Sequence, residues 1–234
     1  MKSKRVTALL LFFLSPLIAE LLSSSAPPSE FFSLGGLLIL MLYGPGVVIV
    51  RETAVRKRIS TIGVVLLGAA YGVLEEGVAC KSFFDPEWPD LGIYSWYGRF
   101  LGVNWPWMLE LIVYHAVFSI MVPILLAEAL FHNVRSEAWI SSRSLKLLGL
   151  LLILDVVVIN AVTPYRPSVL QYALALLMIM LLTVAAFRIR RKLKDVERLL
   201  TSSPRRMWLL TFLWSLTFIA IYWFTPNVLP TLNL

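Results

Sequence analysis

Seven long apolar segments constrain the fold of this chain more than any other feature. Each is about 17–25 residues long, enough for an α-helix to cross the ~30 Å hydrocarbon core of a bilayer. With 59% hydrophobic and 15% charged residues, the chain is more apolar than a soluble domain, in which about 25% of residues are charged. We therefore predict an all-α, polytopic bundle of seven transmembrane helices, at approximately residues 6–23, 34–50, 60–79, 106–131, 145–163, 168–187 and 207–225.

The basic residues predict how this bundle is oriented. Of 21 Lys and Arg residues, 18 lie in the N-terminal segment and in every second connection, at residues 1–5, 51–58, 132–146 and 188–206. Short cytoplasmic connections carry the excess of Lys and Arg, so this distribution predicts a cytoplasmic N-terminus and an external C-terminus. The net charge of +7 then indicates orientation and contact with anionic membrane lipids, not a nucleic-acid-binding surface. We expect a multi-pass protein of the cell membrane.

No linker, repeat or low-complexity segment divides the chain, so we predict one domain over residues 1–234. The start of the sequence could also be a cleavable signal peptide, because a basic segment, an apolar run and "SSSA" follow one another. The apolar run continues past Pro16 and contains Glu20, which favours a retained first helix. The single Cys80 excludes an internal disulfide and a cysteine-based zinc cluster.

Two connections differ from the rest. Residues 188–206 have the basic, amphipathic pattern of a helix that lies on the cytoplasmic membrane surface. Residues 82–105 form a long external connection rich in Trp, Tyr and Phe, which favour the headgroup level of a bilayer. Long connections are often functional, so this segment is either a lid over a site or an aromatic belt at the interface.

Ionisable residues inside the predicted helices provide the main functional signal. A charged side chain at the centre of a membrane-spanning helix costs roughly 2.5–3.5 kcal/mol on insertion scales. The predicted orientation places Glu20, Glu75, Glu76, His115 and Asp155 all in the outer half of the bundle, although they come from four different helices. We expect them to converge on one site.

Helical periodicity assigns faces to the two adjacent glutamates. Gly68, Gly72 and Glu76 recur every four residues, and such a stripe of small residues lets a neighbouring helix approach closely. Glu76 is therefore predicted to face the interior of the bundle. Glu75 would lie about 100° around the same helix and have a supporting role.

Several kinds of site use these residue types. Glu76, His115, Glu20 and Asp155 could hold a divalent metal such as zinc. Glu75 and Glu76 could instead act directly as an acid and a base, with His115 as the partner of an oxyanion. A buried acidic cluster can also relay protons or bind a transported cation, and polar groups can simply join helices. The three external cations Lys81, Arg99 and Arg166 could bind an anionic headgroup or a peptide carboxylate.

The segment "YGPGVVIV" interrupts the second predicted helix with Gly44, Pro45 and Gly46. Broken helices expose carbonyl groups to ions in transporters, although a packing kink has the same sequence pattern. The sequence lacks HExxH, GxSxG, GxGxxG before a helix and a P-loop, so the common zincin, serine-hydrolase and nucleotide-binding classes have no support.

Four segments together resemble an uncharacterised family of prokaryotic multi-pass membrane proteins: "SPLIAELLSSSAPP", "YGPGVVIVRE", "AAYGVLEEGVACKSFFDPEWPDLG" and "TPYRP". The Glu75–Glu76 pair, followed by Lys81 and by His115 on the next helix, is also similar to the CAAX-protease and bacteriocin-processing family. That family activates water with a glutamate, and its motif has an arginine where Cys80 stands here. The resemblance implies a glutamate-type intramembrane protease.

We therefore predict a membrane protein with an acidic intramembrane site, acting as a glutamate- or metal-dependent hydrolase of a membrane-embedded or small-molecule substrate. Glu75, Glu76 and His115 are the expected catalytic residues. The alternative is an ion- or proton-coupled transporter that uses the same acidic cluster.

Overall fold

The computed structural model describes residues 2–189 and the separate positions 209, 212–213, 216–217 and 220. In this part of the chain, five helical segments are long and apolar enough to cross a membrane. They are α3 (Leu34–Lys57), α4 (Thr61–Val73) with its continuation η2 (Leu74–Ala79), the run of α5 (Trp105–Tyr114), η4 (His115–Met121) and α6 (Val122–Leu130), α7 (Ser142–Val162) and α8 (Val169–Arg188). They coincide with the second to sixth predicted spans. The seventh, at 207–225, lies mostly outside the described residues, and the amphipathic segment at 188–206 lies outside them except for residues 188 and 189.

The first predicted span is a helix built into the bundle. It consists of α1 (Lys2–Pro16) and its continuation η1 (Leu17–Leu21), and the short α2 (Pro28–Phe31) follows. α1 packs against α3 with Leu11 fully buried. The Ser15 hydroxyl donates to the backbone carbonyl of Ser119 at 2.6 Å, which joins α1 to η4.

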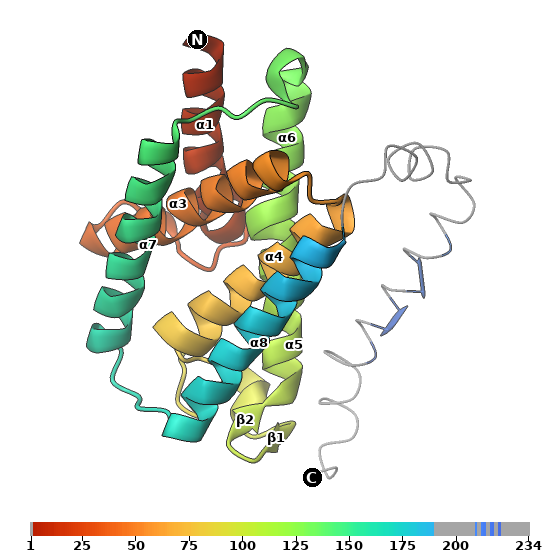
Figure 1. Cartoon of the computed structure of the whole chain (residues 1–234). Helices are drawn as coiled ribbons and strands as arrows, with labels where there is room; N and C mark the ends of the chain where they lie inside the picture. The colour runs from red at the N-terminus through yellow and green to blue at the C-terminus, as the bar shows by residue number, and fades with distance from the viewer. Residues whose placement is uncertain (1, 190–208, 210–211, 214–215, 218–219, 221–234) are drawn as a thin grey trace.

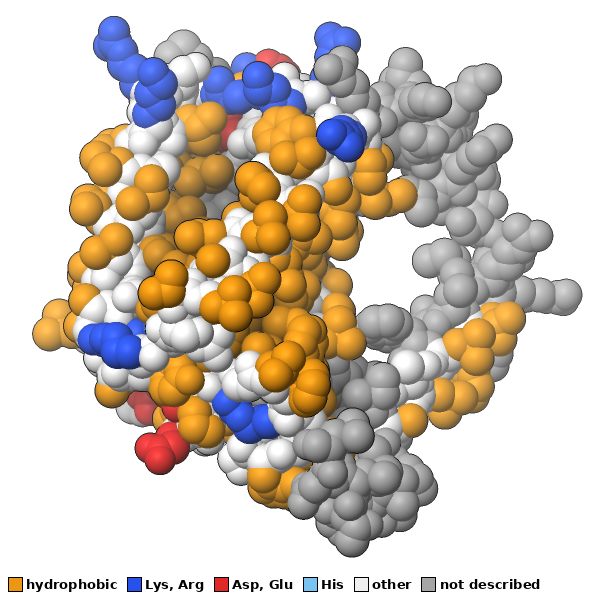
Figure 2. All heavy atoms as spheres, turned by 60° about the horizontal axis from the view of Figure 1, so that its bottom comes forward, with side chains coloured by type: hydrophobic (Ala, Val, Ile, Leu, Met, Phe, Trp, Pro, Cys, Tyr) orange, Lys and Arg blue, Asp and Glu red, His pale blue; other side chains and the backbone are white. Residues whose placement is uncertain are grey.

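Most helices run between two ends of the bundle, whereas α3 lies across the view (Figure 1). The N-terminus of α1, the α3–α4 turn and the α6–α7 connection lie at one end, and the β1–β2 hairpin and the α7–α8 connection lie at the other. Lys and Arg side chains gather at the end where α1 begins (Figure 2). This arrangement is the one that the charge distribution predicts for a membrane bundle; the assignment of the basic end to the cytoplasm stays a prediction.

Small residues let α4 and its neighbours approach one another. A Cβ atom on Gly68 would lie 2.9 Å from the Cα of Ala116, and one on Gly72 would lie 3.0 Å from the Cβ of His115. The stripe expected from the sequence therefore packs α4 and η2 directly against η4, at a distance that larger residues would not permit.

The helix α3 runs without a break through Gly44, Pro45 and Gly46, so the predicted interruption is wrong. These glycines serve close packing instead. A Cβ atom on Gly44 would lie 2.7 Å from the Phe12 ring, and one on Gly46 would lie 2.3 Å from the Tyr71 ring. The absence of side chains here allows two aromatic rings to reach the backbone of α3.

The helices α7 and α8 have few buried residues, and large apolar side chains cover their outer surfaces, including Leu150, Ile153, Leu174 and Leu181. A water-soluble bundle would have polar groups at such positions. The apolar surface is instead what a helix needs in contact with lipid.

The connection between η2 and α5 is folded against the bundle. It contains η3 (Gly92–Ser95) and the antiparallel strands β1 (Arg99–Phe100) and β2 (Val103–Asn104). Phe83, Phe84 and Leu91 are buried, and Asn104 caps α5 by accepting a hydrogen bond from the backbone N–H of Trp107 at 3.1 Å. This aromatic connection therefore has a defined structure next to the site described below. At the basic end, η5 (His132–Val134) follows α6.

A candidate metal centre in the acidic cavity

Three helices widen locally into π-helix, and each π segment carries a residue of the predicted site. Glu20 lies in η1, the pair Glu75 and Glu76 lies in η2, and His115 begins η4. In η2 the i→i+5 bond runs from the N–H of Cys80 to the carbonyl of Glu75 at 2.8 Å. Short π segments are rare and occur frequently at functional sites, because they turn side chains away from their usual helical positions.

The two glutamates and the histidine form one buried cluster. Nε2 of His115 lies 3.2 Å from Oε1 of Glu76, and Nδ1 of His115 lies 3.3 Å from Oε2 of Glu75. All three side chains are buried. The periodicity argument that separated Glu75 from Glu76 is therefore wrong, because the π-helical geometry of η2 directs both carboxylates toward the same imidazole.

The geometry of this cluster suits a metal ion. One ligand atom from each of Glu75, Glu76 and His115 can be chosen so that all three lie within 4.8 Å of one another. Oε2 of Glu75 is buried and makes no hydrogen bond among the described residues. Its nearest polar neighbour is Nδ1 of His115 at 3.3 Å, so this oxygen keeps capacity to bind a cation.

Further polar groups orient the cluster. Nδ1 of His115 lies 2.9 Å from the hydroxyl of Ser119, one turn along η4. The Ser82 hydroxyl donates to Oε2 of Glu76, and Nε1 of Trp107 donates to the Ser82 oxygen at 3.1 Å. Groups that fix the orientation of a ligand in this way are typical of metal sites. Ser82 and Trp107 were not predicted, because only the fold of the aromatic connection brings them to the cluster.

The cluster lines a cavity of about 320 Å³. Glu20 lies on its wall, where it accepts a hydrogen bond from the hydroxyl of Tyr43 on α3. Trp88 and Asp90 of the aromatic connection line the same cavity. Apolar side chains complete it: Leu38, Ile39, Leu42, Leu111 and Ile159. The cavity thus combines a polar cluster with an apolar wall, as small-molecule sites usually do.

Asp155 differs from the other predicted ligands. It is buried on α7, but it does not line the cavity, and its ligand atoms are not grouped with those of Glu75, Glu76 and His115. Glu20 lines the cavity and is likewise outside that group of three. Of the predicted ligands Glu76, His115, Glu20 and Asp155, the structure groups only Glu76 and His115, and it adds Glu75 to them. The sequence gives the depth of Asp155 along α7, but not the neighbour that its side chain meets.

The three cations that were predicted to be external bind backbone carbonyls, two of them at the C-terminal end of α7. Nζ of Lys81 donates to the carbonyls of Asn160 and Thr163 at 2.7 and 2.8 Å, and Arg166 donates to these same carbonyls. Arg99 donates to the carbonyl of Phe84 at 2.5 Å. These side chains donate hydrogen bonds to carbonyl groups at the ends of a helix and of a loop, where cations interact favourably with carbonyls. None of them lines the acidic cavity.

Together, the apolar helices and the buried acidic cluster define a helical membrane protein. The chain belongs to an uncharacterized membrane protein family, whose model matches residues 9–232. It is also 28% identical over 223 residues to an uncharacterized protein of Archaeoglobus fulgidus, covering 92% of this chain and 66% of that protein. The chain thus spans just under two thirds of the length of this relative. No solved structure matches the chain.

The family match confirms the resemblance to an uncharacterised membrane protein family that the four sequence segments indicate. The similarity to the CAAX-protease and bacteriocin-processing family has no counterpart in these matches and stays a prediction.

Proposed function

We propose that this protein is a membrane-embedded hydrolase that uses a divalent metal ion, with zinc as the best candidate, held by Glu75, Glu76 and His115. The observation that carries the proposal is the approach of three potential ligand atoms to within 4.8 Å beside a cavity. Catalytic zinc sites commonly have three protein ligands of this kind and leave one position for water or substrate.

Each residue of the site has a different role in the proposed reaction. A bound metal would supply a Lewis acid and lower the pKa of a coordinated water. Ser119 holds Nδ1 of His115 and so leaves Nε2 directed at Glu76. Ser82 and Trp107 fix the Glu76 carboxylate. Glu20, held by Tyr43 on the same cavity wall, is placed to accept a proton from a water molecule or to donate one to a leaving group.

The cavity lining indicates the class of substrate. Its apolar wall suits a hydrocarbon chain. Its ionisable side chains are Glu20, Glu75, Glu76, Asp90 and His115, together with Tyr43, Tyr114 and Cys80, and the part of the chain that the structure describes contributes no Lys or Arg to it. Such a site favours an uncharged or cationic polar group over an anionic one. We therefore propose that the substrate is a neutral or cationic amphiphile. It would not carry the anionic group that Lys81, Arg99 and Arg166 suggested in the sequence.

The hydrolase fits the structure better than the carrier. A carrier of this type needs a route to both ends of the bundle and is commonly built from interrupted helices. Here α3 is continuous. The acidic cavity is lined by Ser25 and Trp88 from the connections on one side, and toward the basic end the bundle interior holds the Arg51–Glu52 ion pair. With the predicted orientation, the cavity would be reached from the outer side of the membrane.

Metal analysis of the purified protein tests this proposal. The protein is dialysed against zinc-free buffer, incubated with one equivalent of zinc, passed over a desalting column and analysed by inductively coupled plasma mass spectrometry. We expect about one zinc per chain, together with zinc-dependent cleavage of ester or amide amphiphiles in detergent. Absence of retained zinc would refute the metal centre. Zinc-independent, pH-driven cation flux in proteoliposomes would support the carrier instead.

A further inference from the structure

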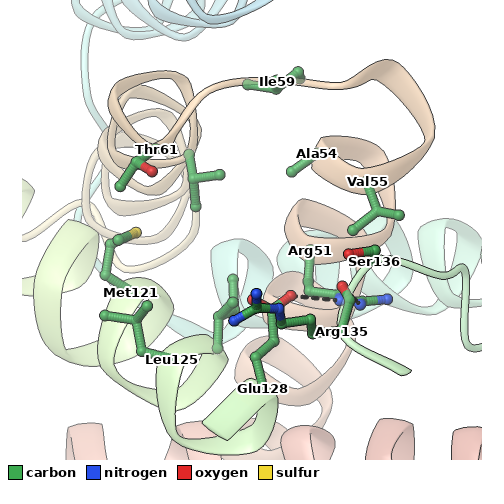
Figure 3. Close-up of a pocket in the computed structure, with 12 residues that line it drawn as sticks. Arg51, Ala54, Val55, Ile59, Thr61, Met121, Leu125, Glu128, Arg135 and Ser136 are labelled. Carbon is green, nitrogen blue, oxygen red and sulfur yellow. Dashed lines mark hydrogen bonds and ion pairs between the residues drawn. The ribbon is translucent and has the colours of Figure 1, made fainter. Parts of the chain in front are cut away.

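A second cavity of about 300 Å³ lies near the basic end of the bundle, apart from the acidic site. It is formed by the end of α3, the α3–α4 turn, the η4–α6 helix and the α6–α7 connection. Its charged residues lie on one side, where Figure 3 shows Arg51, Glu128, Arg135 and Ser136 close together, whereas Thr61 lies on the other side, near Met121. Apolar residues, including Met121 and Leu125, lie across from them (Figure 3).

Arg51 forms the fixed base of this cavity. Its guanidinium donates to Oε1 of Glu52 at 2.9 Å, to Oε1 of Glu128 at 3.2 Å and to the carbonyls of Arg135 and Glu137 at 2.6 and 2.7 Å. It also stacks on the Trp139 ring, with 3.3 Å from Cζ to the ring centroid. These contacts hold the α6–α7 connection against α3, so Arg135 and Ser136 have defined positions at the rim.

Charge and exposure together indicate what this cavity can bind. Among the described residues that line it, the ionisable ones are two arginines and one glutamate, and Arg135 is exposed at the rim. Leu125 on the apolar side is 55% exposed, which joins the cavity to the surface that faces lipid. The cavity is therefore amphiphilic: Glu128 pairs with Arg51, Arg135 adds an exposed cation to the polar side, and Leu125 opens the apolar side to the surface.

We propose that this cavity is a binding site for one anionic phospholipid. The phosphodiester would accept hydrogen bonds from the Arg135 guanidinium and the Ser136 hydroxyl, and an acyl chain would lie along Val64, Met121 and Leu125. The predicted orientation puts this cavity on the cytoplasmic side, where basic cavities between membrane helices bind anionic headgroups, because that leaflet contains anionic lipid. This site is separate from the proposed metal centre and does not depend on it.

Lipid titration of the purified protein, followed by native mass spectrometry, tests the site. We expect phosphatidylglycerol to bind with a stoichiometry of one, and phosphatidylcholine with the same acyl chains to bind at least about tenfold more weakly. Arg135→Gln should weaken phosphatidylglycerol binding about tenfold. The matched control is Lys57→Gln, because Lys57 is an exposed cation at the same end of the bundle but does not line the cavity.

A second variant tests the apolar side. Leu125→Trp should fill the cavity and weaken binding of phosphatidylglycerol while leaving the charges intact. An unchanged melting temperature without lipid shows that each variant is folded. Equal losses in Arg135→Gln and Lys57→Gln would show diffuse attraction and overturn the site, as would equal binding of both lipids. Competition by millimolar inorganic phosphate, with no effect of Leu125→Trp, would assign the cavity to free phosphate and also overturn the lipid proposal.

Discussion

Replacement of Glu76 by glutamine tests whether this residue binds a metal ion or only packs the helices together. The amide retains the shape of the side chain and most of its hydrogen bonds. Its oxygen can still accept from Ser82, and its NH₂ group can donate to Nε2 of His115, which lies 3.2 Å from Oε1 in the native protein. We therefore expect the metal-free variant to fold, with a change in the free energy of unfolding within about 1 kcal/mol.

The effect on zinc binding should be much larger. Changes to groups that only orient a ligand lower metal affinity about 10–100-fold, so loss of a ligand should cost at least about 100-fold. At a zinc concentration of 100 times Kd, the native protein gains about 2.7 kcal/mol. For a chain of this size that gain raises the melting temperature by about 5–10 °C. At the same zinc concentration, the variant should gain about 0.4 kcal/mol, or about 1 °C.

The assay is thermal unfolding in detergent, with and without zinc, alongside the measured zinc content. Glu110→Gln is the matched control, because Glu110 is a half-buried carboxylate on α5 that does not belong to the cluster. This control should keep the full zinc-dependent increase in melting temperature. Equal zinc stabilisation of Glu76→Gln and the native protein would refute the metal centre and leave the two glutamates as groups that join helices.

Two further predictions concern the ion pairs and the orientation of the bundle. Arg51→Gln should destabilise the protein by about 3–5 kcal/mol, because it leaves the fully buried Glu52 without its buried partner. Arg56→Gln should destabilise the protein by about 1 kcal/mol or less, since Arg56 pairs with Glu52 at 3.0 Å but is partly exposed. The free energies of unfolding of both variants are measured in sodium dodecyl sulfate. Equal destabilisation by the two substitutions would contradict the reasoning. In a cysteine-free background made by Cys80→Ser, Asp90→Cys should react with a membrane-impermeant maleimide in intact cells, and Lys57→Cys only after permeabilisation. The reverse labelling pattern would overturn the predicted orientation.

The membrane-spanning helices could be predicted from the sequence because their cause is local. A helix must present about 20 apolar residues to cross the hydrocarbon core, whatever its neighbours are. The predicted span at 60–79 accordingly coincides with Thr61–Ala79. The predicted span at 34–50 is shorter than α3, which continues to Lys57. The sequence assigned Arg51 to a connection, whereas the fold buries it with Glu52 in an ion-pair network.

The sequence also placed Glu75, Glu76 and His115 at a common depth, because depth follows from position along a helix. The direction of their side chains could not be predicted in the same way. Regular α-helical geometry separates Glu75 from Glu76, and only the π-helical turns of η2 and η4 direct both carboxylates to the imidazole.

Contacts between distant segments decided the rest of the site. Ser82 and Trp107 reach Glu76 because the aromatic connection folds back on the bundle. Asp155 is buried on α7, which packs on α3 and η2, but it does not line the cavity. The length of an apolar segment is a property of each helix alone and can therefore be predicted from the sequence. The neighbours of a buried polar group depend on how the helices pack together, which only the tertiary structure decides.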